Sequence, residues 1–216
     1  MKKKTDISQI RFRYKKGALD IKNTSINPFL QFNKWLMEAI KNKVFEPTAM
    51  ALSTTNRANK VSNRIVLLKG LENNNFVFYT NLKSRKSNDI NINKNVAAVF
   101  WWPQIGKQVR IEGNVKLVKK NDADYYFSTR SRKSQIGAWA SNQSSFLKDR
   151  KTLIERTKII EKRFEKKDVS RPKFWSGYKI RPFLVEFWQG RENRLHDRII
   201  YKRIDQKRWK KYRLNP

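Results

Sequence analysis

The sequence contains no cysteine and only one histidine, His196. The lack of cysteine excludes disulfides, thiolate nucleophiles, iron–sulfur clusters and cysteine zinc sites, and it fits a reducing compartment. A single histidine excludes paired-histidine metal sites and allows a Ser-His-Asp triad only with His196 as its base, without a nucleophile elbow to support it. No apolar stretch follows the basic start Met1-Lys2-Lys3-Lys4, so there is no signal-peptide pattern. We therefore expect a cytoplasmic protein without a metal site.

Glycine and long apolar runs are also scarce. The seven glycines form neither a dinucleotide fingerprint nor a Walker loop, so any bound phosphate must be held by side chains. No run of about 18 apolar residues occurs, which predicts no membrane partner.

Acidic residues are few, with 18 Asp and Glu against 50 Lys and Arg, and the formal net charge is +32. Such a surface attracts polyanions, and the basic, aromatic run Trp209–Arg213 is typical of nucleic-acid binding. The basic residues are spread along the whole chain, however, and no nucleic-acid motif accompanies them. We attribute the charge to compositional drift, as from an AT-rich coding sequence, and predict no specific nucleic-acid partner. Hydrophobic residues at 38% and aromatics at 12% indicate a folded protein.

The residue pattern predicts a mostly antiparallel β-barrel with helical additions. Asn27 and Pro28 are typical of a helix start, and apolar residues then recur at helical spacing to about residue 42. Short runs rich in Val, Ile, Phe and Trp predict strands, without the regular strand–helix alternation of a parallel sheet. The expected strands are 48–54, 64–71, 76–80, 96–102, 108–118, 183–189, 198–203 and 208–213, with a hairpin at Glu72–Asn75 and further helices over 121–129 and about 145–166.

Three local groups of residues suggest chemistry. In the first, Arg64 begins an apolar strand, and Ser84 opens a helix that carries Arg85 and Lys86. Together the three cations would bind a phosphate. The alternative is that basic strand ends extend into water.

In the second group, Tyr126, Arg130 and Ser134 recur at a spacing of four. On a helix continued into a turn they would share one face and bind a phosphate monoester, whereas the alternative is a solvated basic turn. The third group follows a glycine turn, with Trp188 before it and Arg194, His196 and Arg198 after it. A lone histidine is more often structural, but this local concentration of charge favours a site.

Taken together, these groups of residues resemble motifs of the pyridoxine/pyridoxamine 5′-phosphate oxidase family. The resemblance runs nearly end to end, and its specificity lies in the order and spacing of the motifs. They are Arg11–Tyr14, Glu46–Met50, Arg64–Lys69, Phe78–Leu82, Ser84–Lys86, Ser134–Trp139, Asn142–Ser145, Glu186–Gly190, Arg194–Arg198 and Arg213–Leu214.

The resemblance implies an FMN-binding split barrel, an antiparallel Greek-key barrel that forms a homodimer with FMN at the subunit interface. The implied phosphate ligands of FMN are Arg64, Arg85 and Lys86. The full set of implied FMN contacts is Arg64, Ile65, Val66, Leu67, Leu68, Lys69, Tyr79, Thr80, Arg85, Lys86, Gln108, Gln143, Ser144, Trp188 and Arg198.

The implied substrates are pyridoxine 5′-phosphate and pyridoxamine 5′-phosphate, which are oxidised to pyridoxal 5′-phosphate. A hydride passes from C4′ to FMN, and O₂ then reoxidises the flavin to give H₂O₂, with ammonia released from the amine. Arg194 and His196 are the implied catalytic residues, which orient the substrate and assist proton removal. The implied substrate contacts are Arg11, Phe12, Arg13, Tyr14, Lys69, Tyr126, Arg130, Ser134, Arg194, Leu195 and His196.

By the same resemblance, residues 1–26 close over the substrate, and residues 27–216 form one domain with a dimerisation region from about 171. Ser131, Lys133 and Arg191 depart from the usual family pattern near the substrate loops. The alternatives are another split-barrel flavin oxidoreductase, a vitamin B6 phosphate carrier without turnover, and a basic nucleic-acid-binding protein. Tyr126, Arg130, Ser134, Arg194 and His196 favour the oxidase over the first two.

Overall fold

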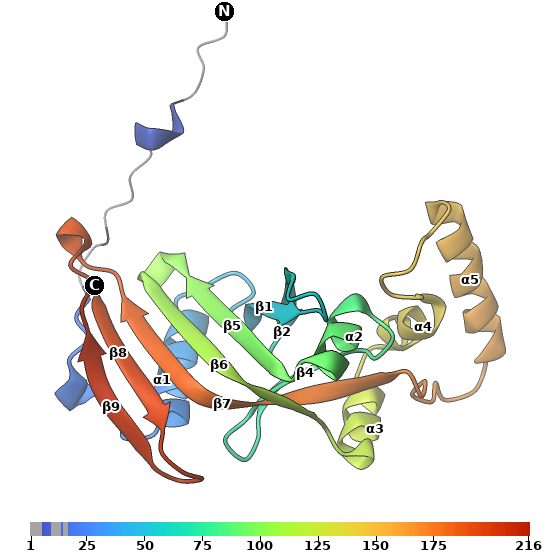
Figure 1. Ribbon diagram of the computed structural model, residues 1–216. Coiled ribbons are helices and arrows are strands. Elements are labelled where there is room, and N and C mark those ends of the chain that lie inside the picture. The colour runs from blue at the N-terminus through green and yellow to red at the C-terminus, as the bar shows by residue number, and fades with distance from the viewer. Residues whose placement is uncertain (1–5, 10–13, 15–16) are drawn as a thin grey trace, which may run out of the picture. The chain divides into compact units, whose positions relative to one another are not determined.

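The computed structural model describes residues 6–9, 14 and 17–216, and Figure 1 shows its helices and strands. The α-helices are α1 Pro28–Lys41, α2 Arg85–Ile92, α3 Lys120–Ser128, α4 Arg132–Ala140 and α5 Arg150–Arg163. The strands are β1 Ala49–Thr55, β2 Val61–Leu67, β3 Gly70–Leu71, β4 Phe76–Asn81, β5 Asn95–Trp102, β6 Lys107–Leu117, β7 Trp175–Gln189, β8 Asp197–Arg203 and β9 Trp209–Leu214.

The strands form an antiparallel sheet, as the sequence predicts. Their order is β2-β1-β5-β6-β7-β4-β3, with β8 paired to β7 and β9 to β8. The pairs β1·β2, β1·β5, β3·β4, β4·β7, β7·β8 and β8·β9 are all antiparallel. In the hairpin between β3 and β4, Asn73 and Asn74 both have positive φ, the backbone conformation that a tight two-residue hairpin turn requires.

Contacts divide the chain into two compact units. The first unit comprises Met1–Pro47, Phe100–Arg110 and Leu184–Pro216, and the second comprises Thr48–Val99 and Ile111–Phe183. The strands β5, β6 and β7 each contribute residues to both units.

The first unit is built around α1. Asn27 accepts a hydrogen bond from the Phe29 amide at 2.8 Å and Pro28 takes the first helical position, so the predicted helix start is confirmed. Phe32 is fully buried on the apolar face of the helix. One turn further on, Trp35 packs edge-on against Phe187 of β7, with ring centroids 5.1 Å apart. This face anchors the helix to the sheet of its own unit.

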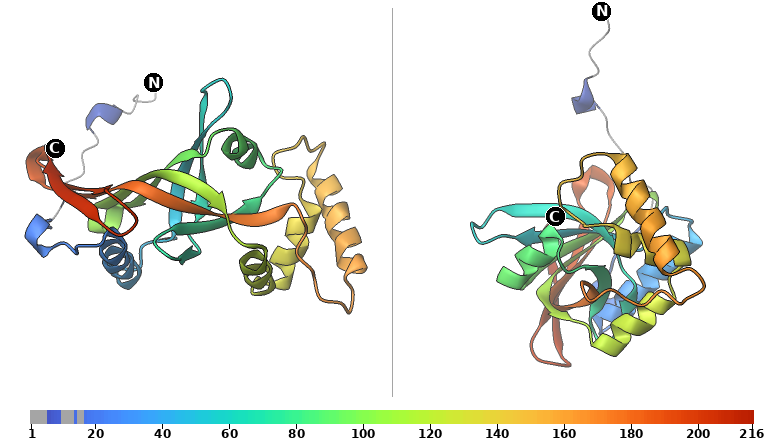
Figure 2. Two further views of the ribbon diagram at one scale, coloured as in Figure 1. Left: turned by 60° about the horizontal axis from the view of Figure 1, so that its bottom comes forward. Right: turned by 90° about the vertical axis from the view of Figure 1, so that its right-hand side faces the viewer.

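In the second unit, α3, α4 and α5 gather at the end where β7 begins (Figure 2). A core of Phe127, Ile136, Phe164, Val169 and Trp175 holds this end together. The helix expected from about 145 is shorter, because the side chain of Asp149 caps it through the Thr152 amide at 2.7 Å. Phe146, which falls within the predicted helix range, instead lies before the cap and is 92% exposed.

Strand β7 starts eight residues earlier than predicted, at Trp175 rather than residue 183. Polar residues interrupt the apolar pattern of residues 175–182, so the sequence pattern does not predict a strand there. Gly177 pairs with Tyr79 of β4, and a Cβ there would lie 2.7 Å from the Tyr79 ring. Position 177 therefore needs a glycine, because the ring of Tyr79 lies against the β7 backbone there. Across the described residues, no helix is long and apolar enough to span a membrane.

Candidate functional site

The second unit contains an open pocket of about 1020 Å³. Five cationic side chains line it, Arg64, Lys69, Arg85, Lys86 and Arg130, and none of its described lining residues is acidic. An excess of positive charge in one cavity favours the binding of anions. The other predicted site residues on its wall are Ile65, Val66, Leu67, Tyr79, Thr80, Tyr126, Ser134, Gln143 and Ser144. Leu68 lies elsewhere, because its side chain is buried in the core with 4% exposed.

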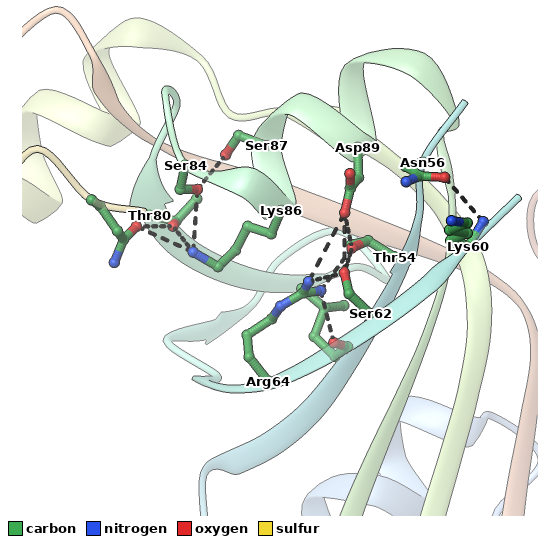
Figure 3. Close-up of polar contacts among 12 residues, drawn as sticks. Thr54, Asn56, Lys60, Ser62, Arg64, Thr80, Ser84, Lys86, Ser87 and Asp89 are labelled. Carbon is green, nitrogen blue, oxygen red and sulfur yellow. Dashed lines mark hydrogen bonds and ion pairs between the residues drawn. The ribbon is translucent and has the colours of Figure 1, made fainter. Parts of the chain in front are cut away.

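Lys86 is the most enclosed of these cations, with 8% of its surface exposed. Its Nζ donates to Thr80 Oγ1 at 3.0 Å, Ser84 Oγ at 3.2 Å and Gln143 Oε1 at 3.1 Å (Figure 3). Burial, with a further contribution from the charge of Arg64, lowers the pKa of Lys86 to about 8. None of its three partners carries a negative charge, so a bound anion would stabilise the protonated amine.

The predicted opening of a helix at Ser84 is confirmed, and its geometry explains how Arg85 and Lys86 come into one pocket. Ser84 has extended backbone angles and its hydroxyl donates to Asn81 O at 2.7 Å, so α2 begins at the next residue. Both cations thus lie in the first helical turn, beside backbone amides that also favour an anion.

Tyr126, Arg130 and Ser134 line the same pocket, and the predicted helix that continues into a turn is confirmed, with Ser134 beyond the turn on a second helix. Helix α3 ends at Ser128, and Ser131 caps α4 by accepting from the Ser134 amide, so Arg130 lies in the connection between the two helices. The cap is favourable because a serine hydroxyl satisfies an amide that has no partner in the first turn. The second helix, which begins directly after the turn, is the feature that the sequence did not predict.

Arg130 is a partly buried cation with one unused donor. Its guanidinium lies over the ring of Trp175, 4.8 Å from the centroid, and its buried Nη1 has no hydrogen-bond partner among the described residues. Tyr126 stacks on Tyr79 at 3.9 Å, and desolvation raises the pKa of both hydroxyls, that of Tyr79 to about 12. A buried donor left unpaired is costly, so this position favours an anionic ligand with acceptor oxygens.

The remaining predicted residues of the described chain lie in the first unit: Tyr14, Gln108, Trp188, Arg194, Leu195, His196 and Arg198. Tyr14 and Trp188 both contact the ring of His196, with centroids 5.7 and 4.6 Å away. Tyr14 and Leu195 also line a second pocket of about 320 Å³. Gly190 is required in this pocket, since a Cβ there would lie 2.4 Å from the Tyr14 ring. Arg11, Phe12 and Arg13 lie outside the described residues.

His196 has a defined hydrogen-bonding state. Its Nδ1 accepts from the Arg191 amide at 3.0 Å, so the neutral ring carries its proton on Nε2. Partial burial, and then the charge of Arg194, lowers the pKa of His196. The neutral ring is therefore the main form at pH 7, and it presents an Nε2–H donor. Arg191, one of the departures from the family pattern, contributes to this state through its main chain.

Arg198 is held by a buried carboxylate that sequence reasoning missed. Glu186 is 2% exposed and accepts from Arg198 Nε at 2.8 Å and from Arg110 Nε at 3.0 Å. This hydrogen bond, more than the charge of Glu186, raises the pKa of Arg198. Glu186 belongs to a motif of the family resemblance, but no local pattern indicates its partners, because Arg110 and Arg198 come from different strands.

Replacing Glu186 with glutamine is expected to lower the free energy of unfolding by about 1–3 kcal/mol. Breaking a buried ion pair costs more than this, but both arginines are partly exposed and water screens part of the loss. Urea denaturation measures the change, and Glu192→Gln, an exposed acid of the same unit, serves as the control. An unchanged midpoint for Glu186→Gln would show that the carboxylate is not needed there.

Two further features of the described chain bear on the site. Trp175 lies parallel to both Tyr79 and Tyr126 in the pocket wall, and nothing in its local sequence indicates this. No group of three or more His, Asp or Glu side chains among the residues described is arranged to hold a metal ion.

Comparison with known families finds two matches. Residues 36–166 match the model described as pyridoxamine 5′-phosphate oxidase. Residues 175–216 match the model described as the pyridoxine 5′-phosphate oxidase C-terminal dimerisation region.

Individual proteins are similar over nearly the whole chain. The pyridoxine/pyridoxamine 5′-phosphate oxidase of Rubrobacter xylanophilus is 44% identical over 98% of this chain and 97% of its own. The enzyme of that name from Leptospira interrogans is 45% identical over 97% and 98%. Among solved structures, PhzG from Burkholderia lata in complex with tetrahydrophenazine-1-carboxylic acid has a TM-score of 0.86 at 27% identity, covering 92% of this chain and 98% of its own. An FMN-binding protein from Nostoc punctiforme, with a TM-score of 0.71 at 15% identity over 89% and 100%, shares the fold.

Proposed function

The chain belongs to the pyridoxine/pyridoxamine 5′-phosphate oxidase family, and from this premise we propose how its own residues oxidise pyridoxine 5′-phosphate and pyridoxamine 5′-phosphate to pyridoxal 5′-phosphate. It is an FMN-dependent enzyme of vitamin B6 metabolism with the split-barrel fold. The roles of individual residues, O₂ as the electron acceptor, and a cytoplasmic location stay predictions.

The observation that carries the proposal is the charge imbalance of the large pocket. A phosphate monoester is largely a dianion at neutral pH, so FMN and a B6 phosphate together bring about four negative charges. Five cations line the pocket, and no acidic residue among its described lining compensates Arg64, Lys69, Arg85, Lys86 and Arg130. Five cations for two phosphates is the composition that such a pair of ligands requires when no glycine-rich loop is present.

The residues present fit FMN. Arg64, Arg85 and Lys86 would hold its phosphate, because the three described hydrogen-bond partners of Lys86 are neutral and burial, with the charge of Arg64, lowers its pKa to about 8. FMN, when bound, would supply the redox chemistry: it would take a hydride from C4′ as the 4′-hydroxyl or amine loses its proton, and O₂ would then take the electrons to give H₂O₂. Residues 65–67, Thr80, Gln143 and Ser144 of the pocket wall are the further contacts that this chain offers.

The substrate phosphate is assigned to Lys69, Tyr126, Arg130 and Ser134. Arg130 brings an unpaired Nη1 donor to the pocket, and the hydroxyls of Tyr126 and Ser134 add neutral donors. A guanidinium suits a phosphate because its N–H groups match the spacing of two oxygens. This set fixes one end of the substrate.

Arg194 and His196 are assigned to the pyridine ring of the substrate. His196 offers Nε2–H as a donor while its Nδ1 is occupied, so in this state it orients the substrate rather than accepting a proton. Arg194 carries the positive charge of the pair and is exposed to solvent. Holding the ring in one orientation is the protein's main contribution to hydride transfer.

We further propose a homodimer with FMN at the subunit interface, in which Gln108, Trp188 and Arg198 contact the flavin ring system. The match of residues 175–216 to a dimerisation region supports the dimer. Closure of residues 1–26 over the substrate is proposed on the same family resemblance.

The proposed function is tested by the absorbance spectrum of the purified protein. Visible flavin bands that bleach on anaerobic addition of pyridoxine 5′-phosphate and return on admitting air would establish cofactor, substrate and acceptor together. Flavin bands that persist with this substrate would contradict the oxidase assignment. Failure to take up added FMN would contradict the cofactor site.

The affinity for FMN is expected to fall above about pH 8, by up to about tenfold per pH unit. Phosphate binding favours protonated Lys86, whose pKa in the free protein is about 8. Below that pH the amine is already charged, and above it binding must take up a proton. Quenching of flavin fluorescence between about pH 7.5 and about pH 9.5 measures the change. Lys86→Arg is the control, because its charge persists and the slope should disappear. A flat wild-type profile would show that Lys86 does not contact the phosphate.

A further inference from the structure

A buried carboxylate with no role in the proposed function lies behind Arg64. Asp89, on α2, is 5% exposed. Its Oδ2 accepts from Thr54 Oγ1 at 2.7 Å and from Ser62 Oγ at 3.2 Å, and it lies 4.0 Å from Arg64 Nη2 (Figure 3). Thr54 and Ser62 belong to the neighbouring strands β1 and β2, so the carboxylate joins the helix to both strands.

The same two hydroxyls also contact Arg64. Its Nη1 donates to Thr54 Oγ1 at 2.8 Å and its Nη2 donates to Ser62 Oγ. A guanidinium only donates and a carboxylate only accepts, so each hydroxyl must accept from Arg64 and donate to Asp89. Asp89 therefore sets the direction of both hydroxyl protons and leaves their lone pairs facing Arg64.

These contacts determine which edge of Arg64 is free. Arg64 Nη1 also donates to Leu52 O at 3.0 Å, so contacts among the described residues use three of its five N–H groups. Two donors remain for a ligand in the pocket that Arg64 lines. An arginine held in this way loses less conformational entropy on binding than a free one.

We propose that Asp89 is a positioning residue for FMN, which acts by holding Arg64 through the hydroxyls of Thr54 and Ser62. The inference rests on the proposed function, since it takes Arg64 as a ligand of the FMN phosphate. The expected change in FMN affinity is opposite in sign to the change that simple electrostatics predicts. A carboxylate near the phosphate repels it, so charge alone predicts that Asp89→Asn tightens FMN binding. Loss of positioning predicts that the same change weakens it.

The experiment measures the Kd of FMN and of riboflavin, which lacks the phosphate, for apoprotein carrying Asp89→Asn. The FMN Kd is expected to rise about tenfold, the lower end of the effect usual for losing a supporting partner. The riboflavin Kd is expected to stay constant, because the effect passes through Arg64 to the phosphate. In an Arg64→Met background the Asp89→Asn change should have no further effect on FMN. Asn88→Ala, an exposed neighbour on α2, is the control and should change neither Kd.

An FMN Kd that falls or does not change in Asp89→Asn overturns the inference. Equal weakening of FMN and riboflavin also overturns it, because that result indicates a general structural role. If Asp89→Asn does not fold, Ser62→Ala removes one of the two bridging hydroxyls at a partly exposed position. A selective rise in the FMN Kd of about threefold then supports positioning, and no change contradicts it. Wild-type protein that binds no FMN would contradict the proposed function itself, a result distinct from all of these.

Discussion

Replacing Arg194 with glutamine is expected to lower kcat by about 100-fold or more while FMN stays bound. Arg194 is exposed and its backbone has a φ of 61°, so the change removes charge and N–H donors without opening a cavity in the core. It is not among the cations of the large pocket to which we assign the FMN phosphate. A small misplacement of the reacting carbon is enough to produce a loss of this size. Flavin content and turnover per bound flavin, measured together, check the prediction.

The pH profile offers a second signature of Arg194. Its charge contributes to the lowered pKa of His196, so its removal should raise that pKa toward the ordinary value. If neutral His196 is the active form, the acid limb of the kcat/KM profile moves to higher pH in Arg194→Gln. Arg194→Lys should retain the position of this limb but recover only part of the turnover, since an ammonium lacks the planar fork.

The control for this experiment is Lys202→Gln, an exposed cation of β8 in the same unit. It removes the same charge from the protein as a whole and should leave turnover and the pH profile unchanged. Loss of FMN from Arg194→Gln with normal turnover per remaining flavin would contradict a role at the substrate.

Replacing Arg130 with alanine is expected to raise the KM for pyridoxine 5′-phosphate by about 100-fold, with flavin content unchanged. Hydrogen bonds to a charged group contribute about 1.5–3 kcal/mol each, and about 1.4 kcal/mol corresponds to tenfold in affinity. Burial lowers the pKa of Arg130, and its Nη1 has no hydrogen-bond partner among the described residues. A bound phosphate would offset the free-energy cost of holding this cation in the free protein. Steady-state kinetics measure the effect.

Two variants separate a phosphate contact from a general change at Arg130. Arg130→Lys retains the charge but loses the paired donors, and its KM should lie between those of the wild type and the alanine variant. Lys133→Ala removes an exposed cation from the first turn of α4 and should leave KM unchanged. A normal KM in Arg130→Ala would place the substrate phosphate elsewhere.

Local sequence was sufficient for much of the fold. The start of α1 depends on Asn27 capping the Phe29 amide, and the β3–β4 hairpin depends on two asparagines that tolerate positive φ. Both are short-range effects, so the residues that cause them adjoin the elements they shape. The missed beginning of β7 has the opposite origin. Its polar residues become a strand because they pair with β4, about a hundred positions earlier in the chain.

Motif spacing also predicted members of the pocket. Tyr126, Arg130 and Ser134 line one pocket from a helix continued into a turn, as expected, and from a second helix that was not expected. The prediction rested on the spacing of four residues between these side chains. The turn keeps all three of them on the wall of the same pocket. Local sequence did not show that Ser131 would cap a second helix after α3 ends at Ser128.

The sequence by itself determined the classes of chemistry that are possible. Without cysteine, paired histidines or a phosphate-binding glycine loop, only side-chain cations remain to bind phosphates. The tertiary structure shows that five of the 50 basic residues, all of them named by the family resemblance, line one pocket, and it alone shows what holds them. Asp89 reaches Arg64 through hydroxyls on two other strands, and Glu186 joins arginines of β6 and β8. Such partners meet only when the sheet forms, because a carboxylate in the sequence does not indicate which distant cation its burial will require.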